Sequence, residues 1–156
     1  MMNHLALPLA IAMTVLCRSA LADDLPDLKA GLWESFTSVR KGVAPMRSTM
    51  CMDSTVYKRL DEKFRKDPQR PCKRTSQEHI GSTFTLTAVC NFHGKPTQSK
   101  TVMIMSGNTA YHSEVHSEDQ SVGVVIDAKY VGACPAGMKL GDMTGPDGKV
   151  MANILE

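Results

Sequence analysis

Apolar and polar residues alternate over most of the chain, and this period of two predicts β-strands. The clearest case is Thr83–Phe92, in which an apolar side chain occupies every second position from Phe84 and threonines fill most of the others. Lys73–His79 is polar on both faces, which predicts either a strand at the edge of a sheet or a poorly buried strand. Five further runs are strand-like: Gly31–Arg40, Arg47–Met52, Gln98–Met105, Thr109–Glu118 and Ser121–Val131.

A single segment changes to helical spacing. Val56, Leu60 and Phe64 recur at i, i+4 and i+8, so they share one face of a helix. Asp53 is placed to cap the helix at its N-terminus, and Pro68 and Pro71 end it.

The connections between these runs are short, as at Ile80-Gly81-Ser82 and Ser106-Gly107-Asn108. Short connections join antiparallel neighbours, because a parallel crossover needs a dozen or more residues. We therefore expect a mainly β fold of about seven strands and one helix, arranged as a curved antiparallel sheet or an open barrel. Glycines and prolines are frequent after Pro135, which predicts an irregular C-terminal tail.

The N-terminus has the pattern of a secretory leader. An apolar stretch covers Leu5–Leu16, and Ala20-Leu21-Ala22 is the small-x-small sequence that a signal peptidase recognises. The stretch is shorter than the roughly 20 apolar residues that span a bilayer. We predict a signal peptide over residues 1–22, cleavage after Ala22, and a single exported β domain over 23–156 in the periplasm.

Four cysteines follow the leader: Cys51, Cys72, Cys90 and Cys134. An even number of cysteines in an oxidising compartment predicts disulfides, and no pair has the Cys-x-x-Cys spacing of a zinc ribbon or a thiol oxidoreductase. Three pairings are possible. Cys72 and Cys90 are equidistant from Gly81, so a hairpin there would place them opposite each other. We therefore favour Cys72–Cys90 and Cys51–Cys134.

Several of these residues also form a recognisable combination. The segment Ala30-Gly31-Leu32-Trp33-Glu34, the four cysteines and Cys134-Pro135-Ala136-Gly137-Met138-Lys139 resemble an uncharacterised family of small proteobacterial envelope proteins, domain of unknown function 3617. The resemblance covers nearly all of the chain after the leader. It implies an envelope location and this fold, and it supplies no catalytic residues.

Trp33 and Glu34 are the first candidate site. Trp33 is the one tryptophan of the sequence, and it is either a core residue or a wall of a ligand pocket. Glu34 falls on the opposite face of the same strand, where a solvated or paired carboxylate is the alternative to a ligand contact.

His112, Glu114 and His116 alternate and therefore share one face of a strand. The two histidines are about 13 Å apart at roughly 3.3 Å per residue, so a metal site would need Glu114, one histidine and ligands from a neighbouring strand. The methionines could bind copper through their thioether sulfurs. The alternative is that they are ordinary core residues. Two same-face pairs occur: Met50 with Met52, and Met103 with Met105.

Basic residues are concentrated in the helical segment, where they either face water or contact an anionic surface such as lipid headgroups. The candidates for such contact are Lys58, Arg59, Lys63, Arg65 and Lys66. The formal net charge of the whole sequence is only +2, which gives no reason to expect a nucleic-acid partner.

No motif of a serine hydrolase, a zinc protease or a phosphate-binding loop occurs, so we expect a protein that is not an enzyme and needs no cofactor. The preferred hypothesis is a monomeric envelope module whose curved sheet binds a small apolar or amphipathic ligand, or another envelope protein. Periplasmic binding of copper or zinc through His and Met is the first alternative. A hydrolase without a recognisable motif is the second.

Overall fold

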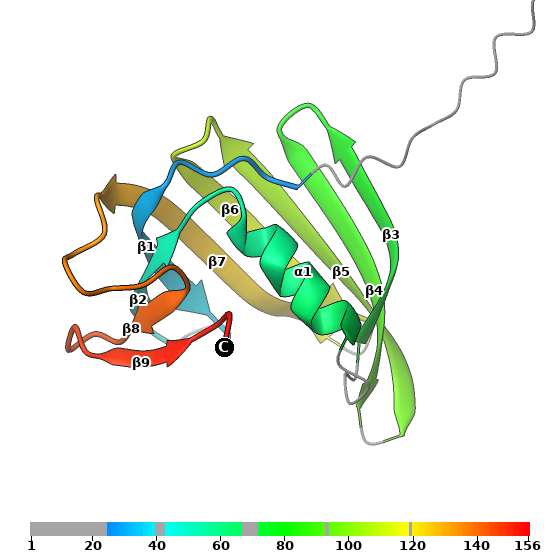
Figure 1. Cartoon of the computed structure of the whole chain (residues 1–156). Coiled ribbons are helices and arrows are strands. Elements are labelled where there is room, and N and C mark those ends of the chain that lie inside the picture. Colours follow the sequence, from blue (N-terminus) through cyan, green and yellow to red (C-terminus); the bar gives the residue numbers. More distant parts are fainter. Residues whose placement is uncertain (1–24, 40–42, 67–71, 93, 119) are drawn as a thin grey trace, which may run out of the picture.

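An antiparallel sheet makes up most of the protein (Figure 1). The structure is a computed structural model that describes residues 25–39, 43–66, 72–92, 94–118 and 120–156. Over these residues the elements are β1 (Gly31–Ser38), β2 (Met46–Met52), α1 (Val56–Lys66), β3 (Cys72–Ile80), β4 (Thr83–Phe92), β5 (Lys95–Ser106), β6 (Ala110–Ser117), β7 (Gln120–Gly132), β8 (Asp142–Thr144) and β9 (Val150–Asn153).

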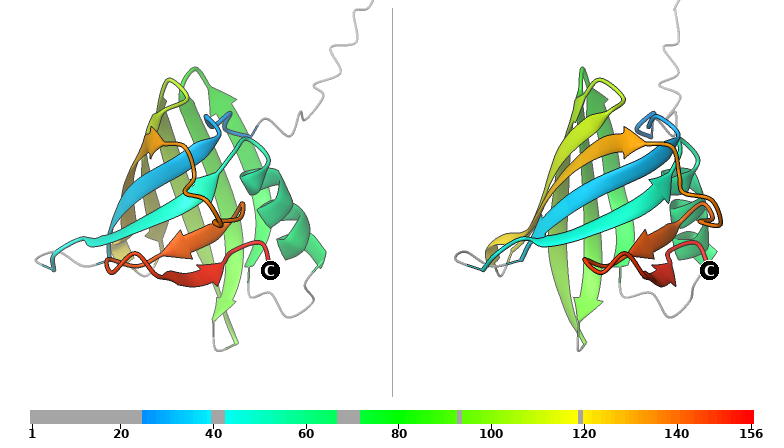
Figure 2. Two further views of the ribbon diagram at one scale, coloured as in Figure 1. Left: turned by 60° about the vertical axis from the view of Figure 1, so that its left-hand side comes forward. Right: turned by 90° about the vertical axis from the view of Figure 1, so that its left-hand side faces the viewer.

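The strands follow the order β3-β4-β5-β6-β7-β1-β2-β8-β9. The sheet is open, because β3 and β9 are not paired with each other among the described residues. Figures 1 and 2 show that it is strongly bent, with α1 against its inner face. The prediction of a mainly β, curved antiparallel sheet with one helix is confirmed, and the polar strand β3 lies at the edge, as expected.

The C-terminal tail differs from the prediction, because it contains two short strands. β8 adds to the sheet beside β2, with Thr49 opposite Thr144 and their hydroxyl oxygens 2.6 Å apart. Asp142 is buried, and its carboxylate accepts hydrogen bonds from the backbone N–H of Lys139 and then from the Asn153 amide, which lowers the pKa of Asp142. Pairing with an existing sheet edge thus orders a segment whose local sequence favours turns.

The helix begins where its sequence predicts. The carboxylate of Asp53 accepts hydrogen bonds from the backbone N–H and the hydroxyl of Thr55, just before the first turn. Val56 is 1% exposed and packs in the core, with Tyr57 and Leu60 partly buried beside it. The side chain of Phe64 lies outside the described part of the structure. In that part, no helix is long and apolar enough to cross a membrane.

The core is centred on Trp33, which is 1% exposed. Its indole Nε1 donates to the carbonyl oxygen of Lys29 at 2.9 Å, and its ring lies 5.8 Å from that of Tyr111. The buried residues around it are Leu28, Met52, Val56, Met105 and Ala128.

Gly31, two residues before Trp33, has a backbone φ of +144°. A Cβ atom there would lie 2.3 Å from the carbonyl oxygen of Gly132, because β1 and β7 approach closely at a register shift. Glycine is therefore required for this strand pairing. The Gly-Leu-Trp-Glu sequence thus combines a close backbone approach with the central core residue.

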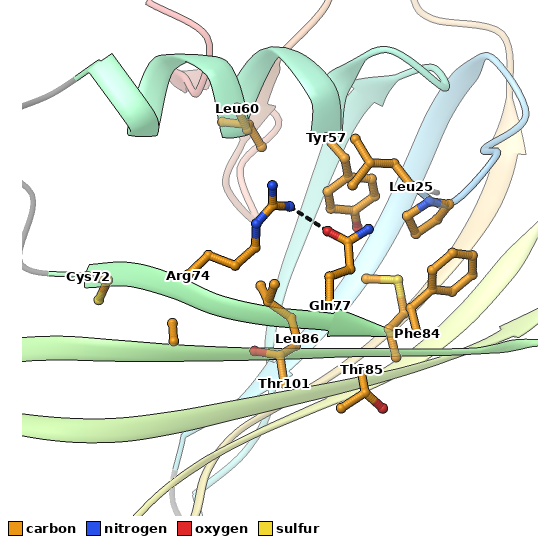
Figure 3. A pocket seen from close by; sticks show the side chains of 13 residues that line it. Leu25, Tyr57, Leu60, Cys72, Arg74, Gln77, Phe84, Thr85, Leu86 and Thr101 are labelled. Atoms are coloured by element: carbon orange, nitrogen blue, oxygen red, sulfur yellow. Dashed lines mark hydrogen bonds between the residues drawn. The ribbon is translucent and has the colours of Figure 1, made fainter. Parts of the chain in front are cut away.

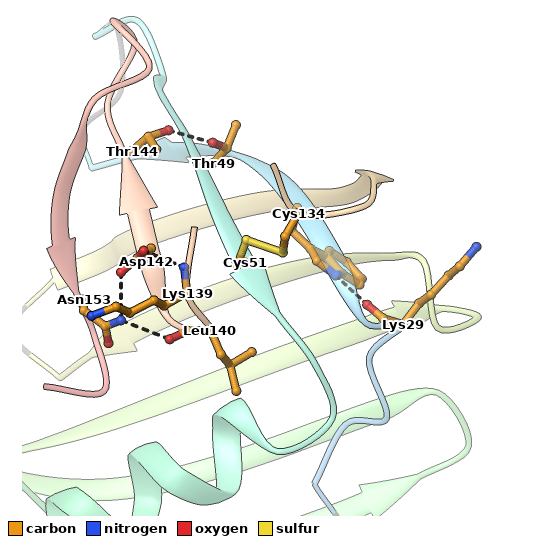
Figure 4. The surroundings of a disulfide bond; sticks show 10 residues. Lys29, Thr49, Cys51, Cys134, Lys139, Leu140, Asp142, Thr144 and Asn153 are labelled. Atoms are coloured by element: carbon orange, nitrogen blue, oxygen red, sulfur yellow. Dashed lines mark hydrogen bonds between the residues drawn. A yellow bond between two sulfur atoms is a disulfide. The ribbon is translucent and has the colours of Figure 1, made fainter. Parts of the chain in front are cut away.

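Both predicted disulfides are present. Cys72 and Cys90 are direct partners in the β3–β4 ladder. Cys51, at the end of β2, is bonded to Cys134, which follows β7, with their Cα atoms 5.7 Å apart (Figure 4). The first bond closes a hairpin, and the second joins segments 83 residues apart in the sequence.

Candidate functional site

A cavity of about 380 Å³ lies between α1 and the inner face of β3, β4 and β5 (Figure 3). The segment at Leu25 and Pro26, ahead of β1, contributes to one end of it. Most of its walls are apolar. The lining residues are Leu25, Pro26, Tyr57, Leu60, Cys72, Arg74, Gln77, Phe84, Thr85, Leu86, Ala88, Thr101 and Met103.

Small side chains on β4 and β5 leave this space open. Leu86 on β4 is paired with Thr101 on β5, and Ala88 follows Leu86 on the same face. Neither Thr101 nor Ala88 is long enough to fill the distance to the helix. Leu60 and Tyr57 project from α1 on the opposite side of the cavity (Figure 3).

Arg74 and Gln77 are the polar side chains that β3 directs into the cavity (Figure 3). Residues three apart on a regular strand point to opposite faces, but a register shift between Arg74 and Ser76 changes this. Arg74 is paired with Ala88 and Gln77 with Leu86, both on the inner face of β4. The guanidinium of Arg74 donates a hydrogen bond to the side-chain oxygen of Gln77.

Tyr57 connects the cavity to the core. Burial raises its pKa well above the ordinary value, and its contact and hydrogen bond with Tyr111 raise the pKa further. The pKa of Tyr111 is also raised by burial, although the hydrogen bond from Tyr57 partly opposes this. Both phenols are therefore neutral at physiological pH. They provide a fixed polar contact at the boundary of an otherwise apolar wall.

The first predicted site, Trp33 with Glu34, does not line the cavity. Trp33 is enclosed in the core, and Glu34 lies on the outer face of β1. The Glu34 carboxylate is 2.6 Å from Arg47 Nε and 3.2 Å from Lys129 Nζ. These two cations, Arg47 first, lower the pKa of Glu34. Trp33 thus has a packing role here, and Glu34 forms ion pairs across three strands.

The predicted histidine cluster does come together on the outer face of the sheet. Glu114 lies 3.2 Å from His112 Nε2 and 2.9 Å from His116 Nε2, and Asp127 on β7 lies 2.7 Å from His112 Nδ1. Asp127 and then Glu114 raise the pKa of His112. The two histidines, His112 first, lower the pKa of Glu114.

In this arrangement the carboxylates serve as partners of the two histidines. Nowhere in the described ranges do three or more His, Cys, Asp or Glu side chains form a group that could hold a metal ion. The two methionine pairs suggested as copper ligands lie in or against the core. Met52 and Met105 are buried in the core, and Met50 and Met103 pack against it.

The basic residues of α1 are only partly described. Lys58, Arg59 and Lys63 are exposed to solvent. The side chains of Arg65 and Lys66 lie outside the described part of the structure, as does the predicted leader over residues 1–22. Contact of this helix with an anionic surface stays a prediction.

Sequence reasoning did not identify the cavity. The alternation in Thr83–Phe92 correctly placed Phe84, Leu86 and Ala88 on one face, but not the empty space above them. The available signal was the contrast between this apolar face and the polar strand Lys73–His79 next to it. That contrast places polar side chains beside an apolar wall.

Comparison with known proteins identifies a family. The model for the protein family of unknown function DUF3617 matches residues 28–134, which include Trp33 and all four half-cystines. No curated protein and no solved structure matches the chain. Because the family model covers more than half of the sequence, this chain belongs to the DUF3617 family.

Proposed function

We propose that this protein is a non-enzymatic envelope module that binds a small apolar or amphipathic molecule in the cavity beneath α1. The observation that carries the proposal is the cavity itself, about 380 Å³ in volume and lined mainly by aliphatic and aromatic side chains. Small-molecule sites are typically concave, mostly apolar and about 300–1,000 Å³ in volume, with a few polar groups. The size and the composition of this cavity agree with that description.

The lining residues also support a binding role over catalysis. Among the described residues that line the cavity there is no histidine, no serine and no carboxylate. These lining residues therefore include no nucleophile with an adjacent base. Cys72 is bonded to Cys90 and is not a free thiol. The hydrolase alternative therefore has no support from the residues around this cavity.

The walls are held in place before any ligand arrives. The Cys72–Cys90 bond joins β3 to β4 directly beside the cavity, and Tyr57 is anchored by its hydrogen bond with Tyr111. A preformed site loses less conformational entropy on binding than a flexible one. This supports reversible binding of a small ligand without large rearrangement.

The test is binding of N-phenyl-1-naphthylamine, a neutral dye whose fluorescence rises in apolar surroundings. The wild-type protein should enhance its fluorescence, and Ala88→Phe should abolish this by filling the cavity. Val89→Phe is the matched control, because Val89 is the next residue of β4 and is 38% exposed on the outer face. Equal enhancement by all three proteins, with unchanged melting temperatures, would show that the dye binds elsewhere.

An envelope location is the second part of the proposal, supported by the leader pattern and the two disulfides. N-terminal sequencing of the protein from a periplasmic fraction should begin at Asp23. Recovery from that fraction of a chain that begins at Met1 would contradict cleavage after Ala22.

A further inference from the structure

We propose that the cavity holds one unbranched alkyl chain along β4, and that Leu25 and Pro26 form the end wall that limits the length of this chain. The inference rests on the proposed function and specifies the class of ligand and the residues that select it. It depends on the shape of the cavity and on apolar contacts.

The shape of the cavity follows the inner face of β4. Ala88, Leu86 and Phe84 line the cavity in succession, and the four residue steps from Ala88 to Phe84 cover about 13 Å. A volume of about 380 Å³ spread over this length is on average about 5–6 Å across. Non-bonded carbon atoms pack at about 3.5–4.0 Å, so two chains side by side would need a width of about 8 Å. The cavity therefore suits one linear chain and not two.

Apolar side chains meet at one end of this path. Leu25 is half-buried and lies at the end away from Cys72, and Pro26, the next residue, is buried and also lines the cavity (Figure 3). Phe84 lies at the same end, paired with Met103 on β5. A polar headgroup among these four side chains would lose hydrogen bonds with water. The terminal methyl group of the chain is therefore the part that lies against the end wall.

The end wall is held in place by the segment that follows it. Leu28 is 3% exposed and packs in the core. The backbone N–H of Lys29 donates to the carbonyl oxygen of Asn108 at 2.9 Å, and the carbonyl oxygen of Lys29 accepts from the indole of Trp33 at 2.9 Å. Because this anchor begins two residues after Pro26, the end wall is fixed. The length of a ligand should therefore decide how well it fits.

Displacement of N-phenyl-1-naphthylamine by straight-chain alcohols from 1-hexanol to 1-dodecanol tests the length limit. Affinity for the wild-type protein should rise about 4-fold for each methylene that becomes buried. Carbon atoms bonded at about 1.5 Å advance about 1.3 Å each along an extended chain, so the rise should stop near about ten carbons. Adamantan-1-ol also has ten carbons, but its cage is wider than a single chain. It should bind at least about 10-fold more weakly than 1-decanol.

Two substitutions of Leu25 should move this limit in opposite directions. Leu25→Ala removes three carbon atoms from the end wall and should allow chains about two carbons longer, whereas Leu25→Phe should shorten the limit. Leu155→Ala is the matched control, because it makes the same change at a half-buried leucine outside the described cavity lining, and it should leave the limit unchanged. Leu60→Ala, on the helix side of the cavity, should weaken every alcohol by a similar factor without moving the limit.

Three results would overturn the inference. The first is an affinity that rises steadily up to 1-dodecanol. The second is a limit that stays in place in both Leu25 variants while their melting temperatures match that of the wild type. The third is binding of adamantan-1-ol as tight as that of 1-decanol. Each of them leaves the proposed function standing if the dye binds and Ala88→Phe abolishes its binding. Failure of the dye to bind the wild-type protein would overturn the proposed function instead.

Discussion

The two halves of the inner face are built from the same kinds of strands but are filled differently. In the packed half, formed by β1, β2, β6, β7, β8 and β9 with Met105 at the end of β5, Trp33 and its neighbours leave almost no exposed surface. In the cavity half, formed by β3, β4 and β5, the side chains beneath the helix are only partly buried. The same helix covers both, with Val56 in the core and Leu60 over the cavity.

The difference comes from segments outside the central strands. Leu28, ahead of β1, is buried in the core, and Leu140 and Ile154 of the C-terminal tail pack against it. The cavity half has only Leu25 and Pro26 at one end. A curved sheet with one helix therefore does not fill its own concave face, and the additional segments complete the packing on one side only. The binding site that we propose is the part left incomplete.

The two disulfides should have large and unequal effects on stability. Removing the Cys51–Cys134 bond, which closes 83 residues, should lower the free energy of unfolding by about 4.5 kcal/mol by loop-closure entropy. Removing the Cys72–Cys90 bond, which closes 18 residues, should cost about 3 kcal/mol. Urea unfolding of the two double Cys→Ala variants compares them. A larger loss from the hairpin disulfide would contradict this ranking.

Core truncation should also separate the two halves. Trp33→Ala should destabilise the protein by about 3–5 kcal/mol, because it removes the central buried side chain. Leu86→Ala should cost less than half as much, since Leu86 already borders empty space. Urea midpoints at constant m-value measure both. Similar losses would mean that the cavity half is as well packed as the other.

Replacing an alanine with leucine should change the stability of the protein in opposite directions in the two halves. Ala88→Leu adds volume to the cavity and should stabilise the protein by about 0.5–2 kcal/mol. Ala128→Leu places the same side chain on the inner face of β7, where Ala128 is 5% exposed, and should destabilise it by about 1–3 kcal/mol. Thermal unfolding of the two variants gives the signs directly. Destabilisation by both would indicate that the cavity half is not open in solution.

The outer face should respond to pH, with the smallest effect. Asp127 and Glu114 raise the pKa of His112 above its ordinary value of about 6.5, so His112 stabilises the fold below that pH. This contribution is lost as pH rises through the folded pKa, and it should stay below about 1 kcal/mol because the pair is exposed. In an NMR titration, Asp127→Asn should lower the pKa of His112, whereas Asp147→Asn, at a distant carboxylate, should leave it unchanged.

Much of the sheet was predictable because its patterns are local. The alternation in Thr83–Phe92 gave the bounds of β4 correctly, and the symmetry of Cys72 and Cys90 about Gly81 gave the hairpin disulfide. The tail strands were missed because β8 has only three residues. Its pairing depends on the exposed edge of β2, which is a tertiary feature.

The cavity was not predictable for a related reason. The sequence does not distinguish Ala88 and Thr101, which border the cavity, from small residues that are well packed. Ala128, for example, is buried in the core. The inward direction of Arg74 depends on a register shift inside a strand that is polar on both faces. The alternation of polar and apolar residues cannot reveal a β-bulge in such a strand. With or without the bulge, polar residues occupy both faces of the strand.

The positions of Cys51 and Cys72 have a consequence for how a ligand would exchange. They flank α1 in the sequence, and each is covalently bonded to the body of the sheet. At its N-terminal end only residues 52–55 separate the helix from a cross-linked position. A helix tethered on both sides cannot swing away as a hinged lid while both bonds remain oxidised. Entry and release should therefore proceed by breathing of side chains along the free edge at β3, and reduction of the disulfides should speed release.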